Sequence, residues 1–358
     1  MTARHEARAP LAVGVIGYGL AGSAFHAPLI AATEGLRVHA IVTGDPTRRA
    51  AAARDHPEAI LVDTADDLLH RAAELSLVVI ATPNRTHVPL ARAALDAGLA
   101  VVVDKPFAPT AAEGRALIDH ARERGLLLTV YQNRRWDGDF RTVRRLAADG
   151  LFGDIMRFES RFERWRPTPK GGWREQADPA EAGGLLYDLG SHLIDQALTL
   201  LGPAVSVYAE LDRRRQGVES DDDSFVALKH ASGARSHLAM SAVAGQPGLR
   251  LRVLGSRAAY VKFGLDVQED ALRRGERPGA PGWGEEPRDR WGSLGAGDDV
   301  RFVPTEPGAY QAFYAAVLRA LRNGGPPPVD PNDAVAGLDV IAAARRSAET
   351  GRVIQLGG

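Results

Sequence analysis

Two short segments of this sequence carry side chains that can take up, release or stabilise protons. Asp188, His192 and Asp195 occur within GGLLYDLGSHLID, and Lys105 stands between an aspartate and a proline at the end of AVVVDKPF. If residues 188–201 form a helix, steps of four and seven residues place the two acids and the imidazole on one stripe. Because unpaired charge is costly to bury, such a stripe on an otherwise apolar helix predicts a catalytic cleft.

These groups suit the oxidation of a secondary alcohol, or the reverse reduction of a ketone. The reaction needs a base for the hydroxyl proton, and His192 is the natural candidate because imidazole titrates near neutrality. Oxidation should therefore accelerate with rising pH as His192 loses its proton. Asp188 could orient His192 or hold a neighbouring hydroxyl, and Lys105 could stabilise the alkoxide as it forms. Which group takes the proton first stays open.

Two other interpretations of the stripe compete with catalysis. Asp188 and His192 could bind a metal, but a carboxylate and an imidazole supply only two ligands, and Lys105 would repel a cation. We therefore expect no metal. The stripe could also face a subunit interface.

The residues up to about 130 alternate short apolar runs with amphipathic stretches. Helices are expected over 86–97 and 110–124, each followed by a glycine. Continuous Val- and Ile-rich strands that alternate with helices predict a parallel sheet covered on both faces. The expected strands are 12–16, 38–42, 60–62, 77–81, 100–103 and 126–130.

A glycine-rich turn follows the first of these strands directly. In Gly17-Tyr18-Gly19-Leu20-Ala21-Gly22, the first glycine permits a tight turn, the second lets the backbone approach a pyrophosphate, and the third allows close packing. An ordinary glycine turn is the alternative, but the strand before the motif and the repeated pattern after it favour dinucleotide binding. The free amides at the helix start would face the anion. Pro28 should kink or break this first helix near residue 24.

Ligands of open α/β sheets bind at the carboxyl ends of the strands, which locates the other cofactor-binding residues. The end of the second strand decides between NAD and NADP: Thr43 and Gly44 are not acidic and Arg48 follows, which favours NADP. NAD stays possible, because a small register error would bring Asp45 to the ribose, and Arg48 could belong to a solvated helix face. The expected contacts at later strand ends are Ala81, Thr82, Pro83, Asn84, His87, Asp104 and Lys105.

After residue 150 the runs mix apolar and polar residues, which predicts a mostly antiparallel sheet with one wetter face. Residues 275–300 are rich in Gly, Pro and charge and are expected to form a long loop. Helices over 308–322 and 332–349 close the chain and could pack back on the first domain. The expected strands are 156–162, 205–211, 225–229, 236–241, 249–254 and 260–262.

These patterns divide the chain into two domains. We expect residues 1–130 to bind the dinucleotide, and residues 131–358 to bind substrate and form oligomers.

Aromatic and arginine side chains surround the predicted catalytic helix in the sequence. Aromatic faces and guanidinium donors suit a ring with many hydroxyls, although each residue alone could simply pack at the surface. We expect Trp173 and Arg174 also to touch the cofactor. The predicted substrate contacts are Asn133, Arg134, Trp165, Arg166, Trp173 and Arg174.

Composition excludes several classes of protein. With 358 residues the chain can bury a large core, and a net charge of −1 gives no attraction to nucleic acid or acidic membranes. The absence of cysteine excludes disulfides and fits a reducing compartment. The N-terminal residues lack the apolar segment of a signal peptide, so we expect a cytoplasmic protein with no membrane partner.

The motifs together resemble the glucose-fructose oxidoreductase/inositol dehydrogenase (Gfo/Idh/MocA) family over nearly the whole chain. GYGLAG, ATPNRTH, DKP and GGLLYDLGSHLID carry the resemblance. FHAPL, YQNRRWDGDF, WREQ, VKFGLDVQEDAL and WGEEP are most similar to its NADP-dependent scyllo-inositol dehydrogenase branch. Two positions depart from the pattern: Asp104 replaces the usual glutamate, and Gly44-Asp45 stands where NADP-specific members carry Ser-Arg or a similar pair.

The resemblance implies an α/β fold with a Rossmann domain and a second α/β domain built on a large open, mostly antiparallel sheet. It implies Lys105, Asp188 and His192 as the catalytic group, often with a cis Lys105–Pro106 peptide. It also implies a homodimer or homotetramer paired through the open sheet. The leading function is therefore nicotinamide-dependent oxidation of an inositol or related polyol. A ketoreductase acting on a nucleotide-linked sugar and a non-catalytic dinucleotide or sugar sensor are the alternatives.

Overall fold

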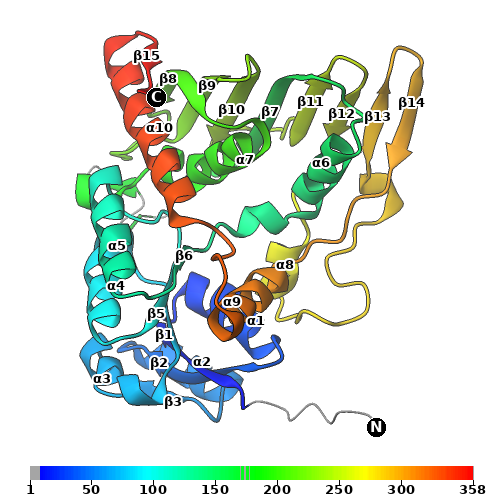
Figure 1. Cartoon of the computed structure of the whole chain (residues 1–358). Helices are drawn as coiled ribbons and strands as arrows, with labels where there is room; N and C mark the ends of the chain where they lie inside the picture. The colour runs from blue at the N-terminus through cyan, green and yellow to red at the C-terminus, as the bar shows by residue number, and fades with distance from the viewer. Residues whose placement is uncertain (1–8, 170, 173–174, 177, 358) are drawn as a thin grey trace.

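The first sheet of this protein is parallel and carries the glycine turn at its centre (Figure 1). The computed structural model describes residues 9–169, 171–172, 175–176 and 178–357. The six strands lie in the order β3-β2-β1-β4-β5-β6, so the strand order reverses between β1 and β4, where such sheets bind ligands. The strands are β1 Leu11–Ile16, β2 Leu36–Val42, β3 Ile60–Val62, β4 Leu77–Ile80, β5 Ala100–Val103 and β6 Leu128–Val130.

Helices between these strands start and stop where the sequence signals predict. The Thr110 side chain accepts a hydrogen bond from the Glu113 amide and caps α5, and Gly125 adopts a positive φ after it. The α-helices of this region are α1 Ala27–Ala31, α2 Pro46–Asp55, α3 Ala65–Leu69, α4 His87–Asp96 and α5 Ala111–Glu123. Short 3₁₀ turns occupy Ala72–Glu74, Asn84–Thr86 and Asn133–Trp136.

Pro28 does not break the first helix, but the helix is irregular near residue 24, where we expected a kink or a break. A π-helical segment, Ala21–His26, runs directly into α1, and the Ala27 amide donates to the Gly22 carbonyl five residues earlier. Pro28 lies in the first turn of α1, where its missing amide is tolerated. The expected break is therefore wrong, and the irregularity takes the form of a wider turn.

The second sheet is mixed, with nine strands in the order β14-β13-β12-β11-β7-β10-β9-β8-β15. Among the described residues only β7 and β10 pair in parallel, and the remaining neighbours are antiparallel, as predicted. Figure 1 shows α6, α7 and α10 along one face of it. The strands are β7 Ile155–Glu163, β8 Ala204–Asp212, β9 Asp223–His230, β10 Arg235–Ser241, β11 Leu251–Gly255, β12 Ala259–Lys262, β13 Gly292–Ala296, β14 Asp299–Val303 and β15 Ile354–Gln355. The α-helices of this half are α6 Gly138–Ala148, α7 Ser191–Leu201, α8 Gln268–Arg273, α9 Gln311–Asn323 and α10 Pro331–Thr350.

The expected loop over 275–300 is wrong at its C-terminal end. Residues 288–290 form a 3₁₀ turn, and β13 pairs with β14 to form a hairpin at the sheet edge. The glycines that suggested a loop are needed within the strand: a Cβ on Gly292 would overlap the Tyr260 ring, and one on Gly295 would overlap the Asp299 carbonyl.

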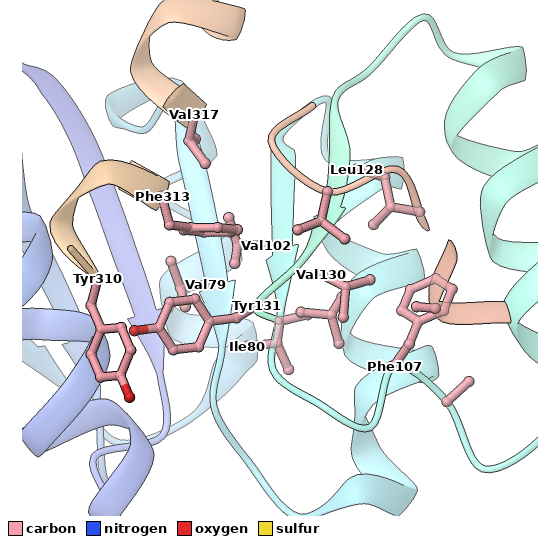
Figure 2. Packing of buried hydrophobic residues seen from close by; sticks show 14 of the residues in the cluster. Val79, Ile80, Val102, Phe107, Leu128, Val130, Tyr131, Tyr310, Phe313 and Val317 are labelled. Carbon is pink, nitrogen blue, oxygen red and sulfur yellow. The ribbon is translucent and has the colours of Figure 1, made fainter. Parts of the chain in front are cut away.

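The two C-terminal helices return to the first domain. α9 packs against α1, and α10 packs against both α5 and α7 (Figure 1). Figure 2 shows the result: Phe313 and Tyr310 near the start of α9 lie beside Tyr131, which follows β6. The rings of Tyr131 and Phe313 are 5.0 Å apart, edge to face. A single apolar cluster therefore runs through both halves of the molecule, and among the described helices none is long and apolar enough to cross a membrane.

Candidate active site

A cavity of about 440 Å³ opens between the two sheets. Residues of both halves line it: Leu20 and Ala21 from the glycine turn, Lys105 from the end of β5, and Asp188 and His192 from the second half. The structure therefore brings together the turn predicted to bind a dinucleotide and the three residues predicted to be catalytic.

Lys105 and Asp188 form an ion pair across this cavity. The Lys105 ammonium donates to the Asp188 side-chain Oδ1 at 2.9 Å and to the Asp188 main-chain carbonyl at 2.7 Å. The Lys105 amide also donates to Asp104 Oδ1 at 2.8 Å, and the Lys105–Pro106 peptide is cis. Both the side chain of Lys105 and its backbone are thus held in place.

The predicted stripe of Asp188, His192 and Asp195 does not form as a whole. Residues Leu186–Gly190 form a π-helical turn ahead of α7, which alters the spacing between Asp188 and the rest of the helix. Asp195 lies outside the cavity lining and accepts two hydrogen bonds from the Arg135 guanidinium, at 2.6 and 2.8 Å. Its partner, and not catalysis, explains this buried carboxylate.

His192 is buried in strongly cationic surroundings. Burial is the largest cause that holds its pKa well below the usual imidazole range, followed by the charges of Lys105, Arg134, Arg250 and Arg164. Its Nδ1 is buried and has no hydrogen-bond partner among the described residues, so Nε2 is the nitrogen available to the cavity that His192 lines. The ring is therefore neutral at physiological pH, and its protonated form gives up a proton more readily than a free imidazolium.

A cluster of arginines packs on the Phe162 ring beside His192. The guanidinium carbons of Arg164, Arg134 and Arg250 lie 4.6, 4.9 and 5.8 Å from the ring centroid. The Glu269 carboxylate, which also lines the cavity, lies beside this cluster. It accepts hydrogen bonds from Arg134 at 2.5 Å and from Arg273 at 2.8 Å.

The glycine turn has the space that a pyrophosphate requires. Gly17 adopts a φ of +98°, and a Cβ there would lie 2.5 Å from the Ala81 carbonyl oxygen. A Cβ on Gly22 would overlap the Gly17 carbonyl, so both positions need glycine for packing. Gly19 is different: its Cβ would meet nothing closer than the Arg48 guanidinium, at 4.0 Å. The backbone at Gly19 is thus open to a ligand, and the residues fit a dinucleotide.

Some side chains after β2 are hydrogen-bonded within the protein, and others are available to bind a ligand. Asp45 caps α2 by accepting from the Arg48 amide at 2.8 Å, and Arg49 donates to Asp63 and to the Leu61 carbonyl. The guanidinium of the exposed Arg48 has no hydrogen-bond or ion-pair partner among the described residues. Thr43 is buried at the end of β2, and Gly44 next to it is exposed.

Several predicted cofactor contacts use their side chains within the protein. Asn84 donates to the carbonyls of Glu181 and Ala182, and His87 lies between the carbonyls of Thr82 and Pro106, at 2.9 Å from each. The Tyr18 hydroxyl donates to Asp55, so this residue can offer only its backbone to a dinucleotide. None of Ala81, Thr82, Pro83, Asn84 and His87 lines the cavity, and their predicted role stays a prediction.

The predicted substrate contacts are divided by strand alternation. Asn133, Arg134 and Arg166 line the cavity, whereas Trp165 points away from it with 60% of its surface exposed. Arg134 is also tied to Asp137 and Tyr310, which makes it a link within the wall. Trp173 and Arg174 lie outside the described residues.

Three cavity residues escaped the sequence analysis. His26, within FHAPL, has Nδ1 2.6 Å from the Tyr314 hydroxyl and Nε2 3.9 Å from Asp104. Arg164 continues the inward alternation of Phe158, Ser160 and Phe162 past the end of β7, a signal that was available. Glu269 arrives on the short helix α8, and no local pattern points to it. Among the described residues no group of three or more His, Asp and Glu could hold a metal ion.

Comparison with known proteins agrees with this architecture. The NAD-binding Rossmann-fold model of the Gfo/Idh/MocA oxidoreductase family matches residues 11–132, and the family's C-terminal alpha/beta domain matches residues 144–356. The chain therefore belongs to the Gfo/Idh/MocA family and is an NAD(P)-dependent oxidoreductase.

Individual relatives extend over nearly the whole chain. The uncharacterized oxidoreductase YdgJ of Escherichia coli is 42% identical, covering 94% of this chain and 96% of its own. The scyllo-inositol 2-dehydrogenase (NADP(+)) IolW of Bacillus subtilis is 34% identical, covering 96% and 95%. The solved structure of yvaA from Bacillus subtilis has a TM-score of 0.91 at 33% identity, covering 97% and 99%.

Proposed function

We propose that this protein is an NADP-dependent dehydrogenase that oxidises one secondary hydroxyl of a cyclitol or sugar ring, or reduces the corresponding ketone. The observation that carries the proposal is the shared cavity, which is lined both by Leu20 and Ala21 of the glycine turn and by the group of Lys105, Asp188 and His192. The similarity to a scyllo-inositol dehydrogenase supports a polyhydroxylated ring as the substrate.

A dinucleotide held by its pyrophosphate at the glycine turn would supply a nicotinamide as hydride acceptor in oxidation or as hydride donor in reduction. The chain's own residues handle the proton. His192 Nε2 accepts the hydroxyl proton, and Lys105 donates a hydrogen bond to the oxygen on which charge develops. Asp188 holds the Lys105 ammonium at 2.9 Å. Because its cationic surroundings make the His192 imidazolium more acidic than a free one, His192 can return the proton to a ketone oxygen.

The preference for NADP rests on Arg48. Its guanidinium, unpaired among the described residues, lies 4.0 Å from where a Cβ of Gly19 would be, beside the open side of the turn that a ribose phosphate can reach. Asp45 Oδ1 already accepts the capping hydrogen bond of α2, which leaves only Oδ2 of this carboxylate for the ribose hydroxyls of NAD.

The test is a panel of inositols, aldoses, keto-sugars and a nucleotide-linked ketosugar with NADP and NAD, followed at the nicotinamide absorbance. Scyllo-inositol is the first compound to assay. Turnover that requires Lys105 and His192 supports the proposal. Cofactor binding without turnover on any member, unchanged in His192→Ala, would favour the sensor instead.

We also propose that the protein self-associates through the face of the nine-stranded sheet opposite α6, α7 and α10. Phe302 on β14 is 66% exposed and Phe263 after β12 is 62% exposed, an unusual cost for a face left in water. Light scattering should show a dimer or tetramer that Phe302→Asp weakens. Val353→Asp, at an exposed valine near β15, is the matched control and should leave the mass unchanged.

A further inference from the structure

The cavity contains two arginine side chains whose donors the described part of the protein does not use. Arg164 and Arg166 both line it, on the inward side of the chain as it leaves β7. Among the described residues neither guanidinium makes a hydrogen bond; Arg166 is exposed and can be solvated by water, whereas Arg164 is largely buried. The nearest carboxylate to Arg164 is Glu269, at 3.9 Å, too far for a hydrogen bond.

Glu269 cannot neutralise Arg164 fully, because its oxygens already have closer partners. Oε2 accepts from Arg134 at 2.5 Å, and Oε1 accepts from Arg273 at 2.8 Å. The Arg164 side chain is only 22% exposed. Burial is the largest cause that lowers its pKa to about 10, and the charge of Arg166 adds to the effect. A half-buried cation of this kind needs negative charge from outside the protein.

Arg164 lies near His192, so the negative charge that it needs would have to come from a group bound near the proposed catalytic residues. Its guanidinium packs on the Phe162 ring, and its charge contributes to the low pKa of His192. Neutral hydroxyls could accept hydrogen bonds from Arg164, but they would leave its charge uncompensated. A carboxylate or phosphate provides two acceptor oxygens that match the guanidinium fork and also supplies the missing charge.

We infer that Arg164 and Arg166 form an anion subsite, so that the ring oxidised by this protein carries a carboxylate or phosphate group. This inference rests on the proposed function, because it assigns a class of substrate to the same cavity. Three sources share the chemistry: an acid of the ring itself, a phosphate ester, and the diphosphate of a nucleotide-linked sugar.

Matched pairs of compounds test the subsite. The holoenzyme is assayed with glucuronate against glucose, galacturonate against galactose, myo-inositol 1-phosphate against myo-inositol, and a nucleotide-linked sugar against its free sugar. We expect the anionic member of at least one pair to have a kcat/KM at least about tenfold that of its neutral partner, the size of one charge-assisted contact, and the pair identifies the source. Equal or better turnover of every neutral member would overturn the inference.

Variants of Arg164 decide whether the preference comes from this side chain. Arg164→Gln should bring the ratio of kcat/KM between the anionic and the neutral member of a pair close to one, and Arg164→Lys should keep part of the preference. Arg161→Gln is the control, because Arg161 lies on the outward side of the same strand and outside the cavity lining. A ratio that survives in Arg164→Gln, or a loss confined to the KM for NADP, would assign Arg164 to another role and contradict the subsite.

Binding separates this inference from the proposed function. Glucuronate, myo-inositol 1-phosphate and the nucleotide-linked sugar are titrated calorimetrically into the NADP complex of the wild type and of Arg164→Gln. Binding that Arg164→Gln abolishes, without turnover of any compound, would support the subsite while rejecting the dehydrogenase. Turnover of neutral rings with no Arg164-dependent binding would do the reverse.

Discussion

Two arginines pack on the Phe162 ring and differ in the partners that the protein gives them. Arg250 is 2% exposed; it donates to Ser160 at 2.6 Å and lies 3.3 Å from the Asp139 carboxylate. The guanidinium of Arg164, which lines the cavity, makes no hydrogen bond within the described structure. The cost of burying a charge is met by protein partners on the core side and left unmet on the cavity side. The difference indicates which charges hold the fold together and which are available to a ligand.

The strongest test on the cavity side is removal of Lys105. Lys105→Met and His192→Ala should each lower kcat by roughly 10²–10⁴-fold, the usual effect of losing one acid–base group. Affinity for NADP, measured by fluorescence titration, should change little because the glycine turn supplies most of it. Since both residues serve one transition state, the double variant should lose much less than the product of the two single losses. Wild-type turnover in either single variant would contradict the catalytic assignment.

Substitution of Arg250, which is paired within the core, should change the stability of the protein and not its substrate specificity. Arg250→Met removes the cation beside two buried carboxylates, Asp139 and Asp137, and should lower the free energy of unfolding by about 3–5 kcal/mol. Arg164→Met removes a cation that makes no hydrogen bond to a described residue, so its effect should be about 1 kcal/mol or less. Urea denaturation of the two variants measures the contrast. Equal losses would mean that Arg164 is as much a part of the core as Arg250.

Two buried histidines, His192 and His87, should make the free energy of unfolding depend on pH. Burial lowers the pKa of His192 and of His87 in the folded protein, so below about pH 6.5 the unfolded chain binds protons that the folded chain excludes. Stability should fall with acid below that pH, by up to about 1.4 kcal/mol per pH unit for each histidine. Unfolding curves at pH 7.5, 6.5 and 5.5 test this, and in His87→Gln the slope should be shallower.

The same pKa shift corrects the pH profile expected from the sequence. Because His192 holds its proton less tightly than a free imidazole, the rise in kcat/KM for oxidation moves below the usual range of histidine. Between about pH 6.5, the ordinary imidazole value, and pH 8 we therefore expect no step that disappears in His192→Ala when residual activity is measured. A step in that range that depends on His192 would show that the bound cofactor raises its pKa.

The smallest expected effect extends the comparison to α2, the helix after β2. Among the described residues the Arg48 guanidinium is unpaired there, whereas Arg49 is paired with Asp63. Arg48→Ala should lower kcat/KM for NADP by about tenfold, one charge-assisted contact, and leave kcat/KM for NAD nearly unchanged. Arg49→Ala, which loses the Asp63 ion pair, is the matched control and should affect both cofactors alike. An equal effect of Arg48→Ala on both would remove the argument for NADP.

Local signals in the sequence were sufficient for the first domain and for part of the site. Continuous Val and Ile runs, the glycine turn and the Lys105 motif each lie within a short stretch, and the structure places them as expected. The β13–β14 hairpin was missed because Gly292 and Gly295 serve close packing against Tyr260 and Asp299, which only the folded chain reveals. Arg164 at the end of β7 lies near Glu269 on α8, and no spacing rule connects segments so far apart.

Asp195 shows how a helical pattern can mislead. Steps along an ideal helix placed Asp195 on the face that lines the cavity. The π-helical turn alters the spacing ahead of α7, and the Asp195 carboxylate is paired with Arg135 instead. A sequence pattern gives the face of a regular helix. It does not reveal an irregular turn or a partner supplied by a distant 3₁₀ segment.

The main-chain carbonyl of Asp188, 2.7 Å from the Lys105 ammonium, has a consequence for how this site responds to substitution. A backbone acceptor is present whatever amino acid occupies the position, so the lysine retains one of its two anchors even if the acidic side chain is lost. Replacement of the Asp188 side chain would therefore leave the Lys105 ammonium one of its two hydrogen bonds. The position of this cation depends in part on the path of the main chain and not on side-chain identity alone.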